Sequence, residues 1–184
     1  MTAGTPMPPV PAYERTQQEW ARLHAAQRWL AEAATDPEVA DREWTQQGVA
    51  LLTAGVTWDA VRAPYKALGP GLDHETTSDV LRRLLHDLRL SGLAFCDPYR
   101  PALYFLVPPG TDRRWPADLA PQEVECLGGT APYIYHLGVS RVDRVAPPGP
   151  HWLMPPNGGD GQIEPELLYR TLRARTSEMR QVGQ

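Results

Sequence analysis

The chain has 184 residues, of which 42% are hydrophobic and 22% charged, and it carries a net charge of -4. This length suits one domain with a substantial core, and the composition is typical of a folded protein rather than a disordered one. The negative charge argues against a surface dominated by nucleic-acid contacts, and no apolar run approaches membrane-spanning length. The first segment, "MTAGTPMPPVPAY", lacks the charged and apolar regions of a signal peptide. We therefore expect a cytoplasmic protein.

Start signals mark the first two predicted helices. "TQQE", which begins at Thr16, has the spacing of a capping box and leads into an amphipathic stretch. "TDPE" then starts a second helix, which we expect to run to about Gln47 with Pro37 in its first turn. The prolines before Thr16 predict a flexible arm over 1–15. A single domain is expected over 16–175, followed by a mobile tail over 176–184.

Strands and one strong helix are predicted in the middle of the chain. "VALLTAGVTWDAVRAP" predicts two short strands around a glycine-containing turn, and a capping signal at Thr76 introduces a helix from Ser78 to Leu90 with Leu84 on its apolar face. "LAFCDP" and "PALYFLV" predict two strands around a turn, and "VECLGG" and "PYIYHLGV" form another pair of apolar runs. "PELLYRTLRARTSEMR" predicts a final helix. Strands that come in pairs favour an α+β fold.

Several common chemistries lack their motifs in this sequence. The two cysteines, Cys96 and Cys126, form neither a disulfide framework nor a CxxC pair, and both are expected to be buried structural residues. The five histidines do not fall at metal-ligand spacings, so we predict no metal and no cofactor. The chain contains no GxSxG elbow, no HExxH and no P-loop.

Four segments carry a resemblance to a known family. "GVALLTAGVTWDAV", "FCDPYRPALYFLVPPGT", "ECLGGTAPYIYHLG" and "PGPHWLMPP" together resemble the N-terminal domain of bifunctional DNA primase/polymerases, and more closely its short single-domain relatives. The resemblance covers about Glu38 to Leu172. It implies an archaeo-eukaryotic-primase-like α+β fold, with paired antiparallel strands and flanking helices.

The same resemblance implies that the catalytic residues are missing. Catalytic members of the family carry two acids, one residue apart, on the strand that matches "WDAVRAP", where this chain has an early Asp59 followed by Arg62. They place a histidine where "DPYRPALYF" has Ala102, and a third acid near Glu125. Two-metal phosphoryl transfer needs several carboxylates. We therefore expect a degenerate active site and a protein that is not an enzyme.

The resulting hypothesis is a non-catalytic primase/polymerase-like module that binds nucleic acid, single-stranded in particular, or a nucleotide in an accessory or regulatory role. The candidate contacts are Arg62, Arg100, Arg113, Arg114, Arg141 and Arg144 for phosphates, and Tyr104 and Trp115 for stacking. Two alternatives stay open. One is a protein-interaction adaptor on the same scaffold. The other is a winged-helix DNA-binding protein built from the helix over Ser78 to Leu90 and the hairpin after it.

Overall fold

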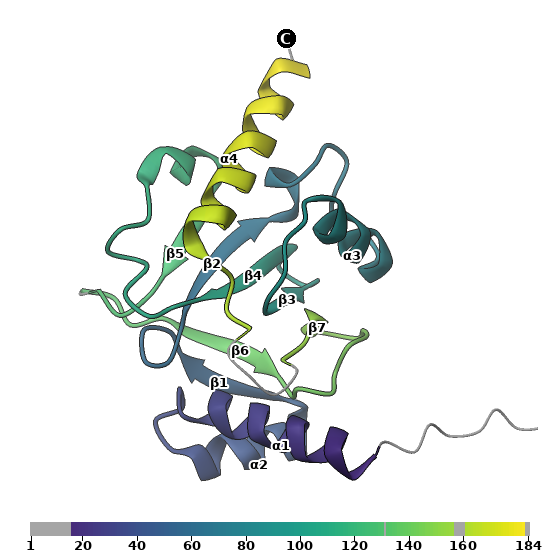
Figure 1. Cartoon of the computed structure of the whole chain (residues 1–184), viewed down its shortest axis with the longest axis vertical. Coiled ribbons are helices and arrows are strands. Elements are labelled where there is room, and N and C mark those ends of the chain that lie inside the picture. The colour runs from purple at the N-terminus through teal and green to yellow at the C-terminus, as the bar shows by residue number, and fades with distance from the viewer. Residues whose placement is uncertain (1–15, 131, 157–160, 183–184) are drawn as a thin grey trace, which may run out of the picture.

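The computed structural model describes residues 16–130, 132–156 and 161–182, and it has an α+β fold of helices and antiparallel sheets (Figure 1). The predicted arm over 1–15 lies outside the described residues. The helices are α1 (Gln17–Ala31), α2 (Pro37–Gln47), α3 (Ser78–Asp87) and α4 (Pro165–Val182), with short 3-10 helices η1 (Tyr65–Ala67) and η2 (Ala117–Gln122). The strands are β1 (Val49–Thr53), β2 (Asp59–Pro64), β3 (Ala94–Asp97), β4 (Ala102–Val107), β5 (Glu125–Leu127), β6 (His136–Ser140) and β7 (His151–Met154).

The strands form a five-stranded sheet in the order β5-β2-β4-β3-β7 and a two-stranded sheet of β1 and β6. The predicted pairing of β3 with β4 is confirmed, in a register that places Ala94 opposite Phe105. The other two predicted pairs are split between the sheets. β1 pairs with β6, and β2 pairs with β4 and β5, so neither β1 and β2 nor β5 and β6 are partners. The segment "HWLM" forms the edge strand β7.

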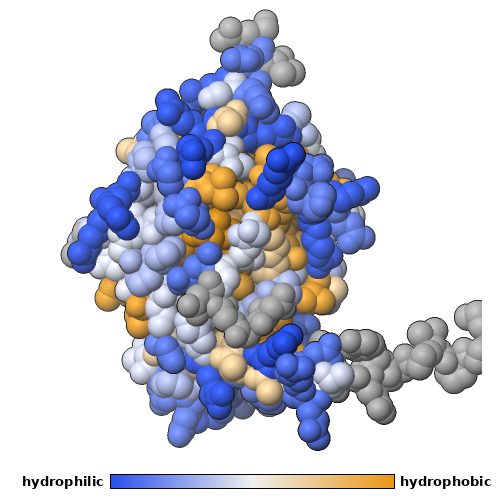
Figure 2. Space-filling view, viewed as in Figure 1, coloured by the Kyte–Doolittle hydropathy of each residue, from blue (hydrophilic) through white to orange (hydrophobic). Residues whose placement is uncertain are grey.

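Two hydrophobic cores lie on opposite faces of the five-stranded sheet. The first joins one face of that sheet to the two-stranded sheet and to α1 and α2. The second joins the other face to α3, α4 and η2. Figure 1 shows this layering, with α1 and α2 beneath β1 and β6, and α4 at the opposite end. Figure 2 shows apolar surface between α3 and α4, at the margin of the second core.

The first two helices begin as their sequences predict. At α1, the Thr16 hydroxyl accepts from the Glu19 amide and the Glu19 carboxylate accepts from the Thr16 amide, so the capping box is complete. At α2, the Asp36 carboxylate caps the helix and Pro37 occupies its first turn. Gly48 ends α2 with a φ of 74°, a left-handed conformation that glycine adopts without strain.

The start and the buried face of α3 differ from the prediction. The Thr76 hydroxyl accepts from the amide of Asp73 in the preceding turn, so it is not available to cap the helix. Leu81 and Leu85 are fully buried, whereas Leu84 is only partly buried against the second core. The helix ends at Asp87, before the expected Leu90. The helix cannot continue to Leu90 because Arg89 has a φ of 54°, which is outside the right-handed helical region.

The hairpin after α3 is not a projecting wing. β4 is the central strand of the five-stranded sheet, and β3 lies between β4 and β7. All six residues of β4 are buried. This arrangement removes the geometric basis of the winged-helix alternative, because a wing must be free to contact DNA.

The last helix extends past the predicted end of the domain. α4 continues to Val182, so most of the segment 176–184 that we expected to be a mobile tail is helical. Leu168, Leu172 and Thr176 are buried along one side of α4, which ties the helix to the second core. Among the described helices, none combines the length and apolarity needed to span a bilayer.

Candidate functional site

A cavity of about 480 Å³ lies where β2 and β4 reach the turn between β3 and β4. The strands contribute Arg62, Pro64, Ala102 and Tyr104 to its lining, and the turn contributes Arg100 and Pro101. η1, the loop after it and the end of η2 add Tyr65, Lys66, Leu72, Asp73, His74 and Glu123. Three of the eight residues predicted to contact nucleic acid, Arg62, Arg100 and Tyr104, therefore meet in this cavity. We call it the sheet-end cavity.

Strand register places Arg62 in a row of side chains across the sheet. It lies opposite Glu125 on β5 and opposite Tyr104 on β4, which in turn lies opposite Phe95 on β3. The Arg62 guanidinium forms an ion pair with Glu125, with Nη2 and Oε1 2.6 Å apart. Its Nε is buried and has no hydrogen-bond partner among the described residues. This Nε donor is therefore unsatisfied within the described structure and closed to solvent, and the exposed part of the guanidinium is what faces the cavity.

Aromatic packing fixes the position of Tyr104. Its ring stacks on Phe95 with the centroids 4.8 Å apart, and Phe95 meets Trp152 edge to face. Burial raises the pKa of Tyr104, so its hydroxyl stays protonated at neutral pH. Tyr104 is 6% exposed. Its ring therefore forms part of the cavity wall and is not free to stack with bases on both faces.

The charges of the sheet-end cavity are mixed. Lys66 forms an ion pair with Glu123 at 2.6 Å, and both side chains are largely exposed. Arg100 is exposed and forms no ion pair with another described residue. Exposed ion pairs contribute only about 0–1 kcal/mol each, so a phosphate could displace Glu123 or Glu125 from its partner. The cavity can therefore present Arg62, Lys66 and Arg100 to an anion.

The acids suggested by the family resemblance do not converge. Glu125 is paired with Arg62 at the sheet-end cavity, whereas Asp59 lies at the other end of β2, opposite Val107. Because side chains alternate along a strand, Asp59 also projects to the opposite face from Arg62. Ala102, where the resemblance implies a histidine in catalytic members, lines the cavity wall. Across the part of the chain that the structure describes, no group of three or more His, Cys, Asp or Glu side chains is placed to hold a metal ion.

Asp59 belongs to a different, buried arrangement. Its Oδ2 accepts from the Asp112 amide at 2.9 Å, and its Oδ1 is buried without a partner among the described residues. Asp112 in turn accepts from the amides of Arg113 and Thr130. Burial raises the pKa of Asp59 to about 6. The pKa of Asp112 is lowered overall. Partial burial acts to raise this pKa, but the hydrogen bonds from Thr130 and Arg113 lower it by more.

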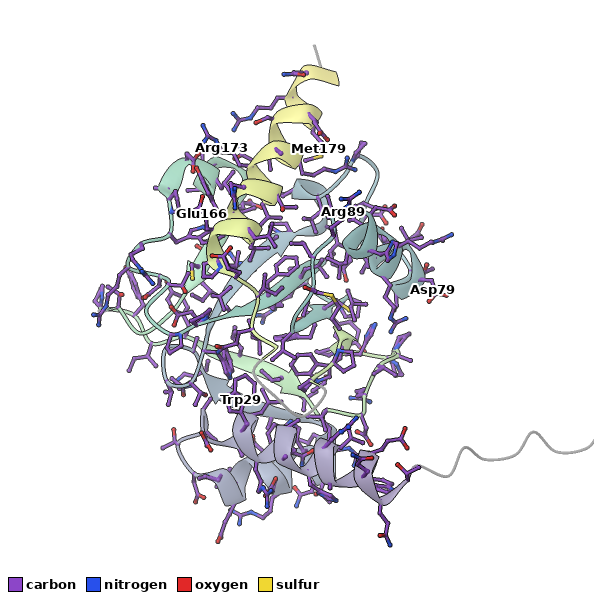
Figure 3. All side chains as sticks on the ribbon, viewed as in Figure 1. Trp29, Asp79, Arg89, Glu166, Arg173 and Met179 are labelled. Carbon is purple, nitrogen blue, oxygen red and sulfur yellow. The ribbon has the colours of Figure 1, made fainter. Side chains whose placement is uncertain are left out.

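The trio Arg113, Arg114 and Trp115 lies away from the sheet-end cavity. Both arginines are exposed, and Trp115 packs edge to face on Tyr169 of α4 with the centroids 5.9 Å apart. A separate cavity of about 270 Å³ between Trp115 and the start of α4 is lined by acids as well as by Arg114. Figure 3 shows Glu166 and Arg173 on this side of α4. Trp115 is thus engaged in packing helix α4.

Arg141 and Arg144 occupy a third region, beside α1 and α2. Arg141 makes two hydrogen bonds to the carboxylate of Asp143. The guanidinium of Arg144 lies against Gly48, where a Cβ would come within 2.8 Å of its Nη1. A cation at this point interacts favourably with the carboxyl end of α2. The predicted arginines are therefore spread over three regions and do not form one basic face.

Nine of the twelve residues that line the cavity were not among the predicted contacts, and these include Lys66, Asp73, His74 and Glu123. Lys66, Asp73 and His74 belong to "YKALGPGLDHE", which the sequence indicates only as a loop. The one feature of the sequence that could have indicated a site here is that this polar loop directly follows a strand. Neither a family model, nor a curated protein, nor a solved structure matches the chain.

Proposed function

We propose that the protein is a primase/polymerase-like module that binds a nucleotide or single-stranded nucleic acid at the sheet-end cavity in an accessory or regulatory role, and that this cavity is non-catalytic. The observation that carries the proposal is the meeting of Arg62, Arg100 and Tyr104 in one cavity of about 480 Å³. Cavities of roughly 300–1,000 Å³ are typical of small-ligand sites. The sequence resemblance to primase/polymerase domains supports the same class of ligand.

The side chains suggest how such a ligand would be held. Arg62 and Arg100 are suited to phosphate oxygens, because a guanidinium can donate two parallel hydrogen bonds. Lys66 adds a flexible ammonium at the cavity rim. The Tyr104 hydroxyl can donate to a sugar or a base. The acids Glu123 and Glu125 would have to release their partners first, so binding should be moderate and sensitive to salt.

The arrangement gives no support to catalysis of nucleotide transfer. Glu125 is neutralised by Arg62, with Nη2 and Oε1 2.6 Å apart. Asp59 is buried on the other face of the sheet. A pair of divalent ions a few ångströms apart requires several carboxylates at one place. We therefore propose a binding role for the cavity.

The test is a titration of the full chain with a fluorescent nucleotide and a labelled single-stranded oligonucleotide over a range of salt concentrations. We expect Arg100→Ala to weaken binding and to lower the slope of log K against log salt by about 0.7 for a single strand. Arg113→Ala is the matched control, since Arg113 is also exposed but lies outside the cavity. Absence of binding at low salt, or equal losses in both variants, would refute the proposal.

One observation favours the alternative of a protein-interaction adaptor. Tyr133 and Ile134, next to each other before β6, are 65% and 72% exposed. Adjacent exposed apolar side chains of this size are often contacts for a protein partner. The adaptor role predicts partners that survive nuclease treatment and bind the wild-type chain but not a Tyr133→Ala, Ile134→Ala double variant. Equal recovery on both chains would exclude this surface.

A further inference from the structure

A hydrogen bond between Ser78 and His151 joins the start of α3 to the start of β7. Ser78 Oγ and His151 Nε2 are 2.7 Å apart, although the two residues are 73 positions apart in the sequence. His151 is 2% exposed, whereas Ser78 is partly exposed. This pair lies outside the sheet-end cavity, and the nucleotide-binding proposal does not use it.

The hydrogen bonds of His151 determine which ring nitrogen carries the proton. Nδ1 lies 2.8 Å from the carbonyl oxygen of Gly149, which can only accept a hydrogen bond. Nδ1 is therefore protonated, and Nε2 has a lone pair that accepts from the Ser78 hydroxyl. A hydroxyl that donates to a base, with the base oriented by a third group, is the arrangement of an activated nucleophile.

The surroundings keep the imidazole neutral and available as a base. Burial lowers the pKa of His151, and the nearby cations Arg82 and Arg144 act in the same direction. Cys96 Sγ lies 3.3 Å from Nε2, but its thiol also donates to the His151 carbonyl oxygen. Burial raises the pKa of Cys96 to about 11, so it remains an uncharged thiol at neutral pH. When the single thiol proton of Cys96 is donated to the His151 carbonyl oxygen, the Nε2 lone pair is left for the Ser78 hydroxyl.

The start of α3 offers hydrogen-bond donors close to Ser78. Ser78 is the first residue of the helix, and its N-cap residue Thr77 makes no side-chain capping bond. The first-turn amides consequently have no acceptor among the described residues until Leu81, which bonds to the Thr77 carbonyl. Asp79 projects outwards with its side chain 84% exposed (Figure 3). Free amides at the positive end of a helix can stabilise an oxyanion.

We propose that Ser78 is a nucleophile that accepts the acyl group of small activated esters, with His151 as its general base. Ser78 Oγ forms a bond to the ester carbonyl carbon while its proton moves to His151 Nε2. The carbon–oxygen bond to the leaving group then breaks, and the departing alkoxide takes the proton from Nε2. A water molecule cleaves the acyl-serine through the same base, which releases the carboxylic acid and restores the hydroxyl.

The probe is a fluorophosphonate, in which Ser78 Oγ would displace fluoride to form a phosphonate ester. Mass spectrometry of the intact chain and of its peptides should place the label on Ser78. Ser78→Ala should remove the labelling, whereas Ser177→Ala should not, because Ser177 is an exposed serine that bonds only to the Arg173 carbonyl. Equal labelling of wild type and Ser78→Ala, or no labelling of wild type, would show that Ser78 only ties α3 to β7.

The role of His151 is tested by rate. His151→Gln should slow hydrolysis of p-nitrophenyl acetate and phosphonylation about 100-fold, the lower range for loss of a general base. Circular dichroism confirms that the variant is folded. If it is not folded, the wild-type pH profile serves instead. The labelling rate should stay level from neutral to mildly acidic pH and fall only below the ordinary imidazole pKa. A rate that instead rises steadily with pH, as for a serine without a base, would overturn the proposal.

Discussion

Replacing the buried Asp59 by asparagine should stabilise the protein at neutral pH. Burial raises the pKa of Asp59 to about 6, and the neighbouring Asp112 carboxylate adds to the rise. In the unfolded chain, the pKa of an aspartate is about 3.9. The folded state therefore holds the proton more tightly. The stabilisation that the folded state gains from this tighter proton binding is complete below about pH 4 and is lost as the pH rises through about 6.

The size of the effect follows from the shift. A difference of about two pKa units corresponds to about 3 kcal/mol. The amide of Asp112 stabilises the charged form in part, so we expect a gain of about 1–3 kcal/mol for Asp59→Asn at about pH 8. Asparagine can still accept from the Asp112 amide, and its NH₂ group would occupy the position of the unpaired Oδ1.

Urea unfolding of wild type and Asp59→Asn between about pH 4 and pH 8 measures this difference. The two proteins should be nearly equal in stability at the acidic end, and the variant should become steadily more stable as the pH rises. Asp87→Asn is the control, because its carboxylate is 78% exposed and should show no such trend. A variant that is less stable than wild type at about pH 8 would show that the ionised Asp59 is stabilised by the fold.

Three further outcomes are expected. Leu85→Ala should lower the free energy of unfolding, measured in urea, by about 2–5 kcal/mol. Leu84→Ala should lower it by less because Leu84 is only partly buried, and Arg83→Ala should change it little because Arg83 is exposed. Equal losses in all three variants would mean that the buried face of α3 is misplaced. Thr16→Ala should cost about 0.5–2 kcal/mol by removing the capping box of α1, whereas Thr16→Asp should largely restore stability. The purified chain should neither make nor extend a primer with magnesium or manganese, and incorporation that disappears in Glu125→Gln would contradict this.

Local signals were sufficient for the parts of the fold that depend on neighbouring residues. The capping box at Thr16 and the Asp36–Pro37 start predict α1 and α2, because the groups that satisfy a helix end lie within a few residues. The β3–β4 hairpin follows from two apolar runs around a short turn. The α+β class follows from these elements together, and it was predicted without knowledge of the sheet order.

Tertiary structure decided what depends on residues far apart in the sequence. β1 pairs with β6, which lies far from it in the sequence. The residue pattern of a strand does not by itself specify which other strand it will pair with. The same holds at the sites. Arg62 and Arg100 were predicted as contacts, but only the sheet brings them to one cavity with Lys66. The contact between Ser78 and His151 arises because α3 packs against β7, a neighbour that no local sequence rule specifies.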